Sequence, residues 1–190
     1  MMNGERTRLR PVERADIQRF VKWFGDPEVR EGLAMIAPIG EQHEERWFDD
    51  NSKRPPAHQA WAIDAQTTAG GTGFVTATAE PTWTHIGSCG FHDIDWRNRS
   101  GEVGIAIGDK TQWNKGFGTD AMRTLVGWGF GELNLNRIAL YVYDDNRRAI
   151  RCYEKVGFKV DGRLREADFH AGRYRDEIVM SILRSEWPDK

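Results

Sequence analysis

The strongest constraint on the fold is an ordered run of strand, glycine loop, helix and strand in the second half of the chain. Residues 102–107 have the apolar pattern of a strand, and the closely spaced Gly116 and Gly118 lead into a helix over residues 119–130. The β-forming residues 137–143 then predict another strand. Because strands alternate with helices here, we expect parallel pairing in this half.

The end of the chain adds a capped helix and the last strands. Asn146 is a residue type that caps helix N-termini, and Gly157 suits the position just after a helix C-terminus, so we predict a helix that runs to Val156. Further strands are predicted at residues 158–160, 163–166 and 174–183.

The first half of the chain predicts consecutive strands, and therefore an antiparallel part of the sheet. A strand at residues 7–11 precedes an amphipathic helix, in which Ile17, Phe20, Val21 and Phe24 recur at helical spacing. The other predicted elements are a helix over residues 41–51 with Trp47 and Phe48 on its buried side, ended by Pro55 and Pro56, and strands at residues 60–65, 74–78 and 83–95.

Composition narrows the class of protein. The 190 residues suit one large α/β domain, and a formal net charge of −2 argues against a general nucleic-acid binder. No His-x-x-x-His pair indicates a metal site, no apolar run reaches membrane-spanning length, and the N-terminus lacks the apolar region of a signal peptide. We therefore expect a cytoplasmic protein with no metal and no membrane partner.

The glycine loop indicates an anion site. The first N–H groups of a helix lack intrahelical partners and the helix dipole is positive there, so a phosphate or pyrophosphate is the natural occupant. Gly116, Gly118 and Ala121 also fit the loose dinucleotide fingerprint, with Asp144 after the next strand. However, eight residues separate Ile107 from Gly116, and too little chain follows for a second mononucleotide-binding half.

A second motif follows the glycine loop at a fixed distance, and the two motifs together narrow the choice of protein family. It runs Asn146-x-x-Ala149-Ile150-x-x-Tyr153-Glu154-Lys155-x-Gly157-Phe158, after Trp113-x-Lys115-Gly116-Phe117-Gly118-Thr119. With these motifs the chain resembles the GNAT superfamily of acyl-CoA N-acetyltransferases, and within it the RimJ/RimL-like branch. The resemblance implies one GNAT domain over residues 1–190, with an α/β fold, a mixed, centrally splayed sheet and helices on both faces.

By resemblance, the co-substrate is acetyl-CoA. The backbone of the loop would hold the pyrophosphate, residues 105–107 would pair with the pantetheine arm like an extra strand, and Asn146 would bind the pantetheine. The residues implied to bind acetyl-CoA are Ile105, Ala106, Ile107, Trp113, Asn114, Lys115, Gly116, Phe117, Gly118, Thr119, Asn146, Ala149 and Tyr153. Trp113 departs from the superfamily pattern, in which many members carry Arg or Gln.

The chemistry of amine acetylation requires a base and an acid. An alkylamine with a pKa of about 10.4 must lose a proton before it attacks the thioester, and the leaving thiolate must gain one. Tyr153 is the candidate acid, and the motif around it favours this role over the alternative of a packed aromatic core residue. Glu102 is the candidate base or amine anchor, although it could equally be a strand-end charge, and His92, Asp93 and Asp95 are further candidates on the acceptor side.

The sequence leaves the acceptor open between protein N-termini and small amines. The alternative function is a non-catalytic acyl-CoA-binding regulatory module. The resemblance also implies a homodimer.

Overall fold

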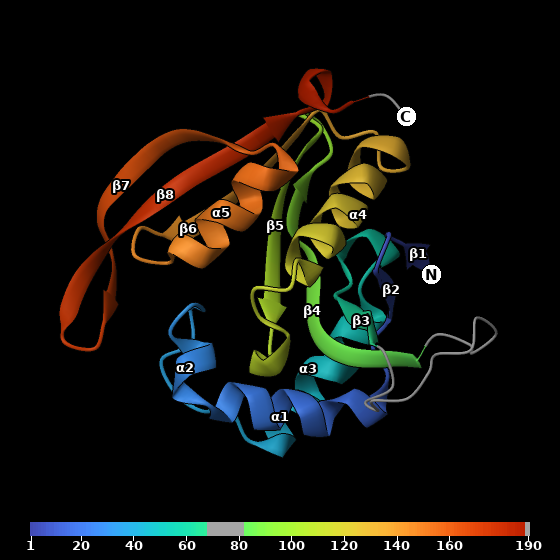
Figure 1. Cartoon of the computed structure of the whole chain (residues 1–190), viewed down its shortest axis with the longest axis vertical. Coiled ribbons are helices and arrows are strands. Elements are labelled where there is room, and N and C mark those ends of the chain that lie inside the picture. The colour runs from blue at the N-terminus through green and yellow to red at the C-terminus, as the bar shows by residue number, and fades with distance from the viewer. Residues whose placement is uncertain (68–81, 189–190) are drawn as a thin grey trace, which may run out of the picture.

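The computed structural model describes residues 1–67 and 82–188 as a single eight-stranded sheet with helices packed against it (Figure 1). The strand order is β1-β2-β3-β4-β5-β6-β8-β7. The strands are β1 (Met2–Asn3), β2 (Thr7–Pro11), β3 (Trp61–Thr67), β4 (Thr82–Asp95), β5 (Ser100–Ile107), β6 (Arg137–Tyr143), β7 (Lys159–His170) and β8 (Arg173–Leu183). The α-helices are α1 (Ile17–Gly25), α2 (Pro27–Arg30), α3 (Glu41–Lys53), α4 (Phe117–Gly131) and α5 (Arg147–Val156).

The mixed sheet confirms the predicted fold class, but the expectation of parallel pairing throughout the second half was wrong. Within the described chain, only β5 and β6 pair in parallel. The reason is that β7 and β8 form a long hairpin. The hairpin inserts β8 beside β6 in antiparallel orientation and leaves β7 at the edge.

Several element boundaries also differ from the sequence prediction. The segments predicted at 158–160 and 163–166 belong to one strand, β7, which stays continuous through two register shifts in its pairing with β8. Helix α2 was not predicted, and helix α4 begins at Phe117 rather than at Thr119. The strand predicted at residues 74–78 lies outside the described residues.

The main core lies between the sheet and the pair α4 and α5, which lie together on one side of it in Figure 1. The apolar face of α4 supplies Ala121, Met122, Leu125 and Val126, all without exposed surface. A smaller cluster joins α1 to α2, with Phe20, Trp23 and Val29 at its centre. The sheet is thus covered by separate groups of helices, which leaves the strand ends between them available for a site.

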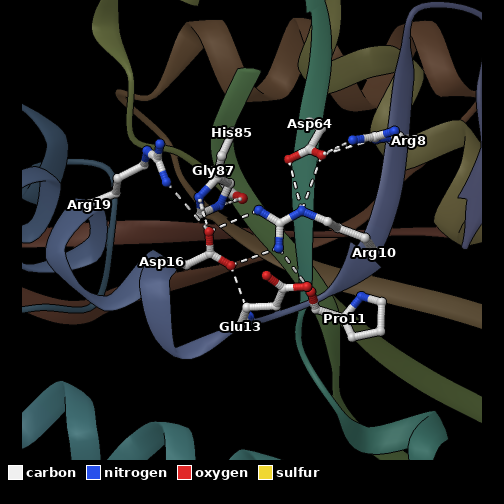
Figure 2. Close-up of polar contacts among 9 residues, drawn as sticks. All are labelled: Arg8, Arg10, Pro11, Glu13, Asp16, Arg19, Asp64, His85 and Gly87. Atoms are coloured by element: carbon white, nitrogen blue, oxygen red, sulfur yellow. Dashed lines mark hydrogen bonds and ion pairs between the residues drawn. The ribbon is translucent and has the colours of Figure 1, made fainter. Parts of the chain in front are cut away.

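A buried ionic network fixes the start of α1 to the sheet (Figure 2). The Arg10 guanidinium donates two hydrogen bonds to Asp16, at 2.7 and 2.8 Å, and its Nε also reaches Asp64. The His85 ring completes the network, with Nδ1 2.9 Å from Asp16 Oδ1 and Nε2 2.9 Å from the carbonyl oxygen of Gly87. The network therefore joins β2, β3 and β4 to the helical segment that follows β2.

The pKa of Asp16 lies far below its ordinary value. Burial on its own raises that pKa, but hydrogen bonds from Arg10, His85 and the backbone of Glu13 outweigh it. Because the folded-state pKa is below the unfolded one, about 3.9, the stabilisation by Asp16 is present above that pH and is lost as the pH falls further.

We predict that Asp16→Asn lowers the free energy of unfolding by about 3 kcal/mol at pH 7, because it leaves a buried guanidinium without its main counter-charge. Urea unfolding followed by circular dichroism measures this. Asp50→Asn is the matched control, since the Asp50 side chain is 80% exposed and its loss should change stability by at most about 0.5 kcal/mol. Equal stability of the two variants would contradict a structural role for the network.

Candidate active site

The site begins where β5 separates from β6. These parallel strands pair only at Ser100, Gly101 and Glu102 of β5, and from Val103 onward β5 pairs with β4 alone (Figure 1). The second edge of residues 103–107 therefore has no strand partner within the described chain. An unpaired strand edge presents backbone donors and acceptors that an extended ligand can pair with.

A single 3-10 turn (Lys110–Gln112) follows β5, and the glycine loop then leads to the N-terminus of α4. Gly116 has a φ of 87°, a left-handed conformation that favours glycine, and Asn114 adopts a φ of 60°. Among the described residues, no side chain caps the first turn of α4. The first N–H groups of a fifteen-residue helix are thus available to an anion.

Side chains on both sides hold this loop in place. The Trp113 indole donates a 2.7 Å hydrogen bond to the carbonyl of Ile107, and Arg6 donates one of 2.9 Å to the carbonyl of Lys115. In the first turn of α4, Asp120 accepts hydrogen bonds from the backbone N–H groups of residues 5, 6 and 7. The position at which Trp113 departs from the superfamily pattern therefore anchors the loop to the end of β5.

A guanidinium lies over the same loop. The Arg148 guanidinium stacks on the Trp113 ring, 3.4 Å from the ring centroid, and burial lowers its pKa. No described residue accepts a hydrogen bond from the Arg148 guanidinium or forms an ion pair with it. A half-buried cation with free donors, next to an open helix N-terminus, suits a phosphate group.

Helix α5 brings Asn146 and Tyr153 to the same cavity. The Asn146 side chain accepts a hydrogen bond from the Ala149 N–H at 3.1 Å, so it caps the helix, and no described residue accepts a hydrogen bond from its amide NH₂. About two turns further along, Tyr153 is 7% exposed and packs against Phe158. Burial raises the pKa of Tyr153, so its hydroxyl stays protonated at neutral pH.

One cavity of about 1000 Å³ connects these features. Every residue that the resemblance implied for acetyl-CoA lines it except Lys115, whose ammonium lies 3.3 Å from Gln112 Oε1. Glu102 and Tyr153, the predicted base and acid, line it as well. Of the other acceptor-side candidates, His92 lines the cavity at a β-bulge of β4, whereas Asp93 and Asp95 are exposed and are not part of the lining.

Two acidic residues of this cavity were missed by the sequence reasoning. Glu177 of β8 pairs with Tyr143 of β6, and Glu102 of β5 pairs with Ala139 of β6. Because residues 139 and 143 point to the same face of the sheet, Glu177 and Glu102 share that face. Burial raises the pKa of Glu177, and the nearby Asp168 and Glu102 raise it further. Glu44 lies on α3, on the helix face where aromatic residues alone were expected.

The remaining candidates fit packing roles. Cys152 receives a 3.4 Å contact from the Thr119 hydroxyl, and burial raises the pKa of its thiol, which opposes a nucleophilic role.

Within the described residues, no group of three or more His, Cys, Asp or Glu side chains is arranged to hold a metal ion. Over the same part of the chain, no helix has the length and apolar character needed to cross a membrane.

Comparison with known proteins agrees with this geometry. The family model described as acetyltransferase (GNAT) domain matches residues 6–159. The chain is 31% identical over 183 residues to "Uncharacterized N-acetyltransferase p20" of Bacillus licheniformis, with 96% of each chain covered. It is 36% identical to spermidine N(1)-acetyltransferase of Escherichia coli strain K12, with 98% of this chain and 91% of the relative covered.

The fold matches solved structures too. Spermidine N-acetyltransferase from Vibrio cholerae, in complex with CoA and spermine, superposes with a TM-score of 0.79. The superposition covers 95% of this chain and 97% of that one at 24% identity, so it establishes the shared fold.

The glycine loop provides a direct test. A Cβ on Gly118 would lie 3.7 Å from the nearest side-chain atoms, an ordinary contact, so Gly118→Ala should fold and bind normally. Gly118→Asp adds a negative charge where we expect phosphate, and it should raise the Kd for CoA about tenfold or more in titration calorimetry. Equal affinity of the two variants for CoA would place the phosphates elsewhere.

Proposed function

This chain belongs to the GNAT acetyltransferase family, and we propose that this acetyl-CoA-dependent N-acetyltransferase acts on a primary amine by direct attack in a ternary complex. One observation carries the proposal. A single cavity joins the open N-terminus of α4 and the free edge of β5 to a buried tyrosine and to carboxylates on the neighbouring strands. Donor and acceptor could therefore meet without a covalent enzyme intermediate.

The acceptor must first lose a proton. In the proposed reaction Glu102 takes it, directly or through water, and the amine nitrogen then forms a bond to the thioester carbonyl carbon. Glu177 shares the face and lowers the cost of holding an ammonium there. A backbone N–H on the free edge of β5, near Ile105, would stabilise the negative charge that develops on the carbonyl oxygen.

Collapse of that intermediate breaks the carbon–sulfur bond and releases the CoA thiolate. Tyr153 is proposed to give this sulfur its proton, and the second proton that the attacking nitrogen loses as the amide forms restores the Tyr153 hydroxyl, directly or through water. Its position in the cavity supports the role, and burial, which raises its pKa, keeps the hydroxyl protonated until the thiolate forms.

The kind of acceptor, the branch of the family and the oligomeric state are also proposals. We favour a small-molecule amine over a protein N-terminus, and the names of the spermidine acetyltransferase relatives support this. The motif around Trp113 supports placement in the RimJ/RimL-like branch, and the family resemblance supports a homodimer.

Replacement of Tyr153 tests the acid. Tyr153→Phe keeps the ring and removes the hydroxyl, so kcat should fall roughly ten- to a thousandfold while the KM for acetyl-CoA changes little. Thiol release from acetyl-CoA in the presence of an amine panel measures this.

Tyr141→Phe is the matched control, because Tyr141 lines the same cavity but is 48% exposed. It should keep kcat within about threefold of wild type. Full activity of Tyr153→Phe would leave that residue a packing role alone.

A further inference from the structure

Glu44 stands out among the buried polar residues of the described chain. It lies on the inner face of α3, one turn before Trp47 and two turns before Asn51, and only 3% of its surface is exposed. Helix α3 packs against α1, so this face looks toward Phe20, whose ring lies 5.6 Å from that of Trp47. A carboxylate in such surroundings needs a partner.

Asn51, a buried polar residue on the same helix face, has a hydrogen-bond partner. The Asn51 side chain accepts a 2.8 Å hydrogen bond from the Ala60 N–H, which ties α3 to the start of β3. Glu44 has no hydrogen bond and no ion pair with any described residue. Burial raises the pKa of Glu44, and nearby His43 offsets this only in part.

Glu44 borders the cavity already described. Glu44 lines it together with Glu102 and Glu177, although the three carboxylates come from α3, β5 and β8. Apolar side chains from α1 and from residues 29–39 complete this part of the wall: Phe20, Phe24, Val29, Leu33, Met35 and Ile39. The titratable side chains of α3 and its C-cap that also line it are His43 and Arg54, and neither is bonded to Glu44.

We propose that Glu44 binds a second cationic nitrogen of the acceptor, so that the preferred substrates are diamines or longer polyamines rather than monoamines. The inference rests on the proposed function. One amine would be acetylated near Glu102 and Tyr153, the alkyl chain would lie against the apolar wall, and a distal ammonium would neutralise Glu44.

The chemistry of the wall fits this class of ligand. An alkyl diamine has an apolar centre and charged ends, which matches apolar side chains flanked by separate carboxylates. Removal of one partner from a buried charge pair costs about 2–5 kcal/mol, which is roughly a thirty- to several-thousandfold loss of affinity. Glu44 would therefore act on acceptor binding and leave the chemical step unchanged.

The experiment compares two acceptors of equal chain length, 1,4-diaminobutane and butylamine, with full-length wild type and Glu44→Gln. Wild type should have a KM for the diamine at least tenfold below that for butylamine. Glu44→Gln should raise the diamine KM roughly thirtyfold or more, and leave the butylamine KM, the acetyl-CoA KM and the diamine kcat within about threefold.

Two variants serve as controls. Glu41→Gln changes an exposed residue of the same helix and should match wild type with both amines. Glu44→Asp keeps the charge and should recover part of the diamine preference. Glu44→Gln should keep or raise the thermal midpoint, because it removes a buried charge that has no hydrogen bond or ion pair with any described residue.

Calorimetric binding of 1,4-diaminobutane to the CoA-bound protein separates the two proposals. Binding that weakens in Glu44→Gln, without any thiol release by wild type, would support the anchor and refute the acetyl-transfer reaction with this amine. Turnover of the diamine with an unchanged KM in Glu44→Gln would refute the anchor alone. An equal rise of both amine KM values, or activity confined to peptide N-termini, would also overturn it.

Discussion

The divergence of β5 from β6 is the constraint on which the rest of the site depends. Two parallel strands that pair at only three positions leave the following residues of β5 with one free edge. The other edge is held by antiparallel pairing with β4, and Gly87 permits the close approach of these two strands, since a Cβ there would lie 2.1 Å from the carbonyl oxygen of Ala106. The free edge is thus a stable part of the sheet, and it requires no ligand to keep it in place.

Hydrogen bonds and ion pairs hold the surroundings of this edge in place. The Trp113 indole ties the glycine loop to the end of β5, and Asp120 ties the first turn of α4 to the β1–β2 turn. The network around Asp16 in Figure 2 holds the start of α1 against β2, β3 and β4. A site whose walls are fixed in this way loses little conformational entropy when it binds a ligand.

Local patterns were enough to predict the strands and helices near the glycine loop, because strand alternation, loop glycines and the Asn146 cap depend on neighbouring residues. The position of β8 between β6 and β7 could not be predicted in this way. It results from a hairpin, and strand order is decided by contacts between residues distant in sequence. The resemblance supplied the splayed sheet, which periodicity alone does not encode.

The candidate site also has one part that local sequence motifs predict and another part that depends on contacts between residues distant in sequence. Its phosphate side lies in two contiguous motifs, so residues such as Gly116 and Asn146 could be named from sequence. Its proposed acceptor side is assembled from α3, β5 and β8, and a glutamate on a polar helix is ordinarily solvent-exposed. Only the packing of α3 on α1 shows that Glu44 is buried, and only strand pairing places Glu177 on the same sheet face as Glu102.

Amide hydrogen exchange with and without CoA is the most direct test of the account. The central claim is that the free edge of β5 and the first turn of α4 hold the acyl donor through backbone groups. CoA should therefore slow exchange at residues 103–107 and 117–119, while the β6 amides paired with β8 remain unchanged. CoA binding that leaves both segments unprotected, or that protects a different part of the sheet, would contradict it.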